Sequence, residues 1–117
     1  MTNINKLVLA GRLTRDPESK VVGDMTIVRV GMAVNERKKV DGTWVDEPVY
    51  VDVRLFGKRA EAFLKYHSKG SQCCFPDARL AFDQWDDKET GKRRSHLYVI
   101  ANSWEFIGAK QDTPTPF

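Results

Sequence analysis

The chain has 117 residues, of which 41% are hydrophobic and 30% are charged. This length suits a single domain with a sizeable core, and the composition excludes both a disordered chain and a membrane-spanning protein. Nineteen basic and sixteen acidic side chains leave a formal charge of +3, which permits a polyanionic partner without requiring one. The start, MTNINK, resembles neither a signal peptide nor a transit peptide, so we expect a cytoplasmic protein.

The first half of the chain predicts three strands. Residues 6–13 and 26–34 are rich in β-branched residues, and turn signals at Asp16-Pro17 and Gly23-Asp24 separate them. Residues 49–56, with the sequence VYVDVRLF, alternate strictly between aliphatic and other side chains. They form the third predicted strand.

One short helix and two strands follow. Residues 58–67 place Ala60, Phe63, Leu64 and His67 at helical spacing, and Gly70 lies just beyond as a stop signal. His67 then falls at the helix end, where a cation interacts favourably with the dipole. Strands over residues 78–85 and 96–107 complete an all-β protein, with the helix between strands 3 and 4. This order predicts a five-stranded, partly open barrel of the oligonucleotide/oligosaccharide-binding (OB) fold.

The third predicted strand has two chemically different faces. Alternation gives it an aliphatic face and a face with Tyr50, Asp52, Arg54 and Phe56. The fourth strand likewise groups Arg79, Asp83 and Trp85, and the second strand adds Arg29. Charged residues between aromatic residues are poor candidates for a dry core. We call the surface formed by these eight side chains the open face.

Aromatic rings interleaved with arginines suit single-stranded nucleic acid. Unpaired bases stack on rings such as Tyr50, Phe56 and Trp85, while Arg29, Arg54 and Arg79 can contact phosphates. The alternative is that the rings pack beneath a loop or against another subunit.

Two charged loops extend this surface in the prediction. Residues 35–47 have a hairpin signal at Asp41-Gly42, and residues 86–95 turn at Thr90-Gly91. We expect phosphate contacts from two basic clusters, and a further stacking ring from Trp44. The clusters are Arg37, Lys38 and Lys39 in the first loop and Lys92, Arg93 and Arg94 in the second. The alternative for both loops is a solvated charged hairpin.

Signs of catalysis are sparse. Asp52 and Asp83 could hold Mg²⁺ in a nuclease, but ion pairs with Arg29, Arg54 or Arg79 explain them more simply. No metal-ligand spacing and no nucleotide-binding loop are present, so we expect no metal, no cofactor and no enzymatic activity. Cys73 and Cys74 are adjacent and read as buried thiols.

Several segments resemble the bacterial-type single-stranded DNA-binding proteins of replication, recombination and repair. The segments are NKLVLAGRL with RDPE, VRLFGK with AE, KGSQ, ARL, and Trp85 before the Thr90-Gly91 turn, in family order between residues 4 and 108. The resemblance implies an OB fold, a homotetramer, and binding to single-stranded DNA without sequence preference or catalysis. The family's stacking rings fall on Tyr50, Phe56 and Trp85. It also implies association with the nucleoid. The alternative is a primosomal or other protein-interaction module on the same barrel.

Three further expectations concern assembly and the chain end. Apolar residues on both faces of 97–107, including Leu97, Tyr98 and Trp104, predict a subunit interface. Residues 73–77 look one residue longer than a regular strand and predict a bulge at Pro76. Residues 1–108 read as the DNA-binding domain, and 109–117 as a short disordered tail. The tail ends in Pro116 and Phe117, which by resemblance dock replication and repair proteins.

Overall fold

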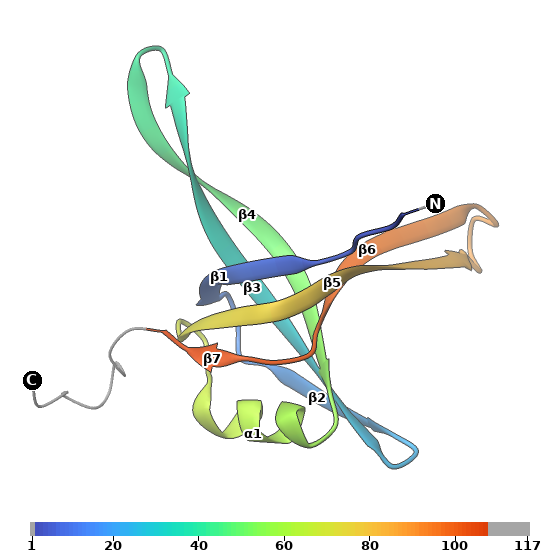
Figure 1. Cartoon of the computed structure of the whole chain (residues 1–117). Coiled ribbons are helices and arrows are strands. Elements are labelled where there is room, and N and C mark those ends of the chain that lie inside the picture. The colour runs from blue at the N-terminus through green and yellow to red at the C-terminus, as the bar shows by residue number, and fades with distance from the viewer. Residues whose placement is uncertain (1, 108–117) are drawn as a thin grey trace, which may run out of the picture.

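The chain folds into one continuous β-sheet with a single short helix at one end (Figure 1). The computed structural model describes residues 2–107. Its elements are β1 (Leu7–Leu13), β2 (Glu18–Val22), β3 (Met25–Val40), β4 (Thr43–Phe56), α1 (Lys58–Tyr66), β5 (Gln72–Asp86), β6 (Arg93–Ala101) and β7 (Glu105–Phe106). The predicted all-β class with one short helix is confirmed.

The sheet closes on itself through β1. Its strand order is β1-β3-β4-β6-β5-β7, and β1 also pairs with β5, so that the path returns to its first strand. The five predicted strands correspond to β1, β3, β4, β5 and β6, and α1 lies between the third and fourth of them. The described residues form two further strands, β2 and β7. Sequence patterning misses them because β2 is exposed along its whole length and β7 has two residues.

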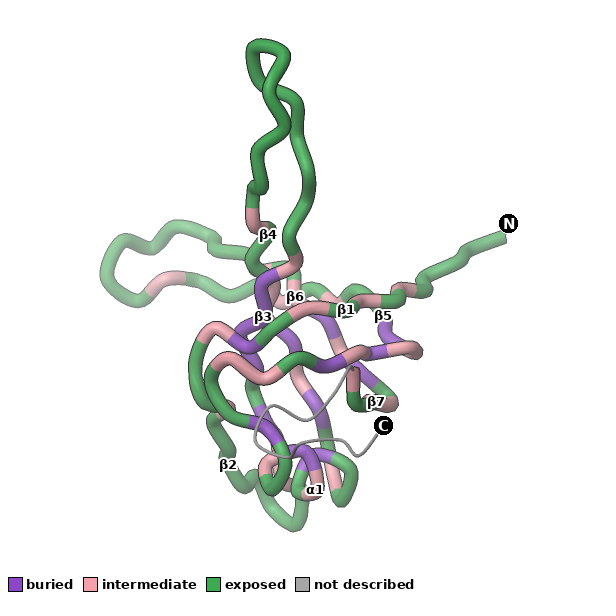
Figure 2. The backbone as a smooth tube through the Cα atoms, turned by 90° about the vertical axis from the view of Figure 1, so that its left-hand side faces the viewer, coloured by how far each residue is buried: buried purple, intermediate pink, exposed green. Residues whose placement is uncertain are grey.

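The first predicted loop is largely strand, and the second is strand at both of its ends. β3 and β4 stay paired from Ile27↔Phe56 to Val40↔Thr43, and Asp41 and Gly42 make the turn with φ values of 50° and 81°. This confirms the hairpin signal. The prediction that residues 35–47 form a loop is wrong, because all but the turn residues belong to β3 and β4. β5 and β6 likewise pair as far as Asp86↔Arg93. The two-residue turn lets the β3–β4 ladder continue into solvent, and residues 87–92 connect the end of the β5–β6 ladder. Two arms therefore project from the sheet (Figures 1 and 2).

The core lies between the inner face of the sheet and α1. Val53 and Leu55 of β4 and Ala60 and Phe63 of α1 are buried there, as alternation and helical spacing predicted. The predicted bulge is also confirmed, because Leu7 pairs with Ala78 while Leu9 pairs with Phe75. Two residues of β5, Pro76 and Asp77, therefore lie opposite one residue of β1, Val8.

Two expectations for the C-terminal half are wrong. β6 ends at Ala101, so Trp104 and Phe106 do not continue its alternation. They pack instead on α1, where the Trp104 indole N–H donates to the Arg59 carbonyl at 2.9 Å. His67 does lie at the end of α1, as predicted, but not as a cation beside the helix dipole. Its ring is buried between those of Phe63 and Phe106, at centroid distances of 4.0 and 5.4 Å. Burial lowers the pKa of His67, although a contact with the Phe63 carbonyl partly opposes the shift.

Candidate nucleic-acid interface

The open face is built from four neighbouring strands. The β3–β4 register sets Arg29 opposite Arg54 and Gly31 opposite Asp52. The β5–β6 register sets Asp83 opposite His96 and Trp85 opposite Arg94. β4 and β6 are themselves paired, so the two ladders form one surface. The alternation that defined the open face from the sequence is therefore present in the fold.

The three predicted stacking rings lie on this surface. Tyr50 is 71% exposed, Trp85 is 48% exposed and Phe56 is 38% exposed. An exposed tyrosine or tryptophan next to cations has a free π-face for a base. Phe56 is the most covered of the three and lies where β4 ends, opposite Ile27. Their contact with bases stays a prediction.

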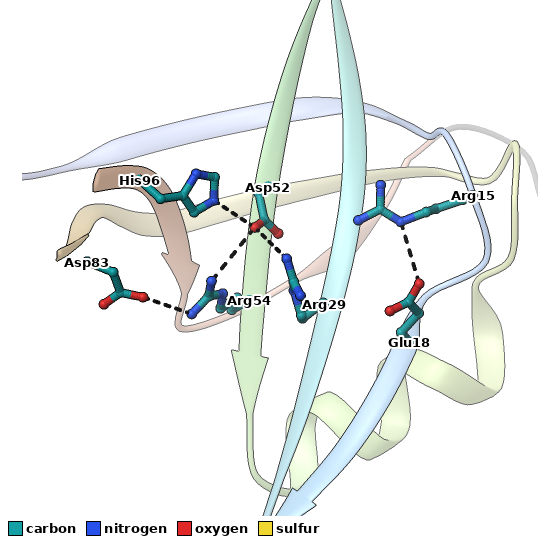
Figure 3. A network of polar contacts seen from close by, with 7 residues as sticks. All are labelled: Arg15, Glu18, Arg29, Asp52, Arg54, Asp83 and His96. Atoms are coloured by element: carbon teal, nitrogen blue, oxygen red, sulfur yellow. Dashed lines mark hydrogen bonds and ion pairs between the residues drawn. The ribbon is translucent and has the colours of Figure 1, made fainter. Parts of the chain in front are cut away.

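Asp52 is the centre of a charged network on the open face (Figure 3). Its Oδ2 lies 3.2 Å from Arg29 Nη2, 3.9 Å from Arg54 Nη2 and 3.0 Å from His96 Nε2. A carboxylate only accepts, so His96 Nε2 carries the proton in this bond. Burial by itself raises the pKa of Asp52, but the hydrogen bonds from His96 and Arg29 and the two guanidinium charges hold that pKa below its usual value.

Arg54 connects this network to β5 and β6. Its guanidinium lies 3.5 Å from Asp83 Oδ2 and 3.9 Å from the centre of the Tyr98 ring. The Tyr98 hydroxyl donates to Asp83 Oδ1 at 3.5 Å, and the His96 ring stacks beside that of Tyr98. The sequence analysis did not assign His96 and Tyr98 to this face. Alternation along β6 was the signal that could have placed them there.

The arrangement argues against a nuclease site. Asp52 and Asp83 face arginines, as the simpler sequence interpretation predicted, although Arg79 is not one of the partners. Arg79 is exposed and makes no ion pair with another described residue. No group of three His, Cys, Asp or Glu side chains within residues 2–107 could hold a metal ion. Cys73 is buried, which raises the pKa of its thiol to about 12, and Cys74 is half-buried.

The first basic cluster is divided between the two faces of its arm. The guanidinium of Arg37 and the ammonium of Lys39 lie 5.5 and 5.9 Å from the Trp44 ring, on the same side as Tyr50. Lys38 points to the other side and pairs with Glu47 at 3.5 Å. Trp44 is exposed, so it can still stack on a base, but Lys38 does not share its face.

The second cluster is divided in the same way. Arg94 lies opposite Trp85, on the open face, and pairs with Asp87 at 3.2 Å. Arg93 lies one position along, on the opposite face, and pairs with Asp86 at 3.5 Å. Lys92 precedes the strand and is exposed. Consecutive residues of a strand point to opposite faces, so Arg93 and Arg94 cannot share one face, and this limits the predicted phosphate contacts.

A pocket on the open face includes residues that the sequence analysis missed. Its volume is about 370 Å³, and its lining includes Thr14, Arg15, Gly31, Tyr50, Asp52 and His96. Thr14 and Arg15 come from the connection between β1 and β2. They lie far from Tyr50 in sequence, so no local periodicity links them.

One sequence expectation lies outside the described residues, and one finding concerns membrane spans. The proposed tail, with Pro116 and Phe117, lies beyond the described residues. Among those residues, no helix is long and apolar enough to cross a membrane.

Comparison with known proteins gives consistent matches. The model of the single-strand binding protein family matches residues 4–107. The single-stranded DNA-binding protein of Borreliella burgdorferi is 37% identical over 114 residues, which are 97% of this chain and 76% of that protein. The protein of the same name from Helicobacter pylori is 39% identical over 112 residues, 94% of this chain and 62% of its own length.

Solved structures also match. The wild-type single-stranded DNA binding protein from Thermus aquaticus superposes with a TM-score of 0.75 at 25% identity. A deletion mutant of that protein gives a TM-score of 0.77 at 26% identity. Each match covers 92% of this chain and 52% of the Thermus chain, so the chain spans about half the length of those proteins.

Proposed function

The chain belongs to the single-strand binding protein family, and we propose that it binds single-stranded DNA and coats it without sequence preference. The observation that carries this proposal is the open face, where the exposed rings of Tyr50 and Trp85 lie among Arg29, Arg54 and Arg79. Stacked base pairs in a duplex present no base faces to such rings.

Binding is an equilibrium in this proposal, with no bond made or broken. Bases stack on Tyr50, Trp85 and Phe56, and Trp44 extends the path along the β3–β4 arm. Arginines beside these rings neutralise phosphates, so affinity falls as salt rises. The five longer strands serve as the barrel of an OB fold, with residues 1–108 as the DNA-binding domain.

Titration with oligo-dT and with duplex DNA of equal length tests the proposal. We expect tight binding to oligo-dT with quenching of tryptophan fluorescence, because Trp85 is exposed on the open face. Duplex DNA should bind much more weakly. Equal affinity for the two forms would contradict the proposal, and binding to neither would favour a protein-interaction module.

A pair of variants tests the stacking role of Tyr50. Tyr50→Ala removes the most exposed ring of the open face and should cost about 1 to 3 kcal/mol of binding free energy. Tyr50→Phe keeps the ring and should bind nearly as tightly as the wild type. If both variants bind alike, Tyr50 does not stack on a base.

Assembly as a homotetramer completes the proposal. Leu80, Phe82 and Leu97 are exposed on the face of the β5–β6 arm that is continuous with the core. Exposed apolar side chains grouped in this way support an interface with another copy of the chain.

Partner recruitment is the last part of the proposal. Pro116 and Phe117 would place an aromatic ring in an apolar pocket of replication, recombination or repair proteins on nucleoid DNA. Deletion of Phe117 should leave oligo-dT affinity unchanged and weaken recovery of those proteins with DNA-bound protein. Equal recovery with and without Phe117 would remove the docking role.

A further inference from the structure

Arg15 lies across β3 at a position where only glycine leaves room for it. Thr14 N–H donates to the Gly31 carbonyl at 2.8 Å, which fixes the β1–β2 connection against the strand. A Cβ at residue 31 would lie 2.6 Å from Arg15 Nη1 and 2.7 Å from Thr14 Oγ1. The missing side chain of Gly31 therefore allows the guanidinium to lie beside the open face. Figure 3 shows Arg15 pointing toward β3 from the side opposite His96.

Arg15 is also weakly engaged compared with its neighbours. Its ion pair is with Glu18 at 4.0 Å, and both side chains are largely exposed. Exposed pairs at that separation contribute little. Arg29 and Arg54, in contrast, are held by Asp52. Arg15 can therefore turn to a phosphate without breaking a buried network.

The pocket beside Arg15 has the components that one nucleotide requires. Tyr50 supplies an exposed ring, Arg15 a cation and Thr14 a hydroxyl group. Its volume of about 370 Å³ falls within the usual range for small-ligand pockets, about 300–1,000 Å³.

The one carboxylate in the lining of this pocket, that of Asp52, is not free to read a base. Asp52 Oδ2 already accepts hydrogen bonds from Arg29 and His96, and it lies 3.9 Å from Arg54 Nη2. Asp52 Oδ1 is inaccessible and has no hydrogen-bond partner among the described residues. Stacking and charge contacts are common to all four nucleotides, whereas base identity is read by hydrogen bonds to base edges.

We infer that this pocket is a subsite for one nucleotide of bound single-stranded DNA, in which the base stacks on Tyr50 and a phosphate contacts Arg15 and Thr14, with no readout of base identity. The inference rests on the proposed function. It assigns a phosphate contact to a residue of the β1–β2 connection and gives Gly31 the role of keeping that contact open.

Salt titrations of oligo-dT binding by two single variants and their combination test the subsite. Arg15→Gln should weaken binding and reduce the slope of log K against log salt by about 0.7, the value for one lost phosphate contact on a single strand. Gly31→Ala should have the same effect because its methyl group displaces the guanidinium. The double variant should lose no more than either single variant, since both remove one contact.

The matched control is Arg93→Gln, which removes the same charge from the opposite face of the sheet. Its slope should stay that of the wild type. The ratio of affinities for oligo-dT and oligo-dC should be equal in Arg15→Gln and the wild type. Thermal unfolding of each variant establishes whether it is folded. If Gly31→Ala does not fold, Arg15→Gln alone decides the test.

The outcomes separate this inference from the proposed function. A wild-type slope for Arg15→Gln, with binding still weakened by Tyr50→Ala, overturns the subsite and leaves the DNA-binding proposal standing. If the ratio of affinities for oligo-dT and oligo-dC differs between Arg15→Gln and the wild type, the subsite does read base identity and that part of the inference is wrong. If the wild-type chain binds no single-stranded DNA, the proposed function fails first.

Discussion

Asp52 is an anion in the middle of a surface that has to attract phosphates. Its carboxylate is matched by two guanidinium groups and by a hydrogen bond from the His96 imidazole, so its negative charge does not stand unpaired on this surface. The same contacts restrict the rotamers of Arg29 and Arg54, and preorganised arginines lose less entropy when they bind an anion. Asp52 therefore has two opposed effects on DNA binding: its charge repels phosphate, and its contacts position Arg29 and Arg54 to bind phosphate.

Asp52→Asn separates these effects. The amide keeps the shape but removes one negative charge, so we expect tighter binding of oligo-dT at low salt and a slope steeper by up to about 0.7. Weaker binding would show that positioning dominates. Because the pKa of Asp52 lies below its usual value of 3.8, the wild-type carboxylate stays charged near neutrality. It should therefore contribute no pH dependence to binding between pH 5 and 8.

Sequence alternation predicted the ring positions but not all of their polar neighbours. Tyr50, Phe56 and Trp85 follow from period-two patterning within single strands, which needs no tertiary information. Arg15 reaches the open face from a connection, through a contact with Gly31 sixteen residues along the chain. Such a contact depends on strand pairing and on the absence of a Cβ, neither of which leaves a periodic signal.

At the scale of elements, the arms show why a run of basic residues is not a basic patch. Strand pairing turns Arg94 toward Trp85 and Arg93 away from it, although both were predicted to contact phosphate. The sequence analysis treated this segment as a loop, in which all three basic side chains could share one side. The extended ladder excludes that arrangement.

Single substitutions on the β5–β6 arm test this division. Arg94→Ala should reduce the salt slope of oligo-dT binding by about 0.7, because it removes an open-face cation next to Trp85. Arg93→Ala, with the same loss of charge, should leave the slope near that of the wild type. Equal losses for both variants would mean that DNA wraps around the arm and contacts both of its faces.

The end of α1 is fixed to β7 by a stack of rings. His67 lies between Phe63 and Phe106 and next to Trp104. The Phe63 carbonyl only accepts, so His67 Nδ1 carries the proton in their 3.1 Å contact. Nε2 is buried without a hydrogen-bond partner among the described residues, which suits a neutral ring.

This buried histidine predicts a pH-dependent stability. The pKa of His67 is lowered in the fold below its ordinary value of 6.5, so the unfolded chain binds the proton more tightly. The contribution is present above pH 6.5 and is lost as the pH falls toward the lowered pKa. The denaturant midpoint should therefore decrease between pH 7.5 and 5.5, and His67→Phe should flatten that decrease. An equally steep decrease in the variant would assign it to other groups.

At the scale of the whole molecule, the sheet presents two surfaces of different chemistry. One is the open face, with its rings and arginines. The other continues the core outward along the β5–β6 arm, where Leu80 pairs with Val99 and Phe82 with Leu97. Val99 is buried, whereas Phe82 is 53% exposed and Leu97 is 62% exposed. The apolar stripe thus begins in the core and extends beyond what a single chain covers.

Phe82→Glu tests whether this stripe joins copies of the chain. A charge buried at an apolar interface is costly, so the variant should have a lower mass by light scattering than the wild type. We expect about four times the 13.4 kDa chain mass for the wild type. Ser19→Glu adds the same charge on exposed β2 and should keep the wild-type mass. Phe82 lies on the opposite side of β5 from Trp85, so the dissociated variant should still bind a short oligo-dT. A monomeric wild type at micromolar concentration would contradict the assembly and leave the stripe without a partner copy.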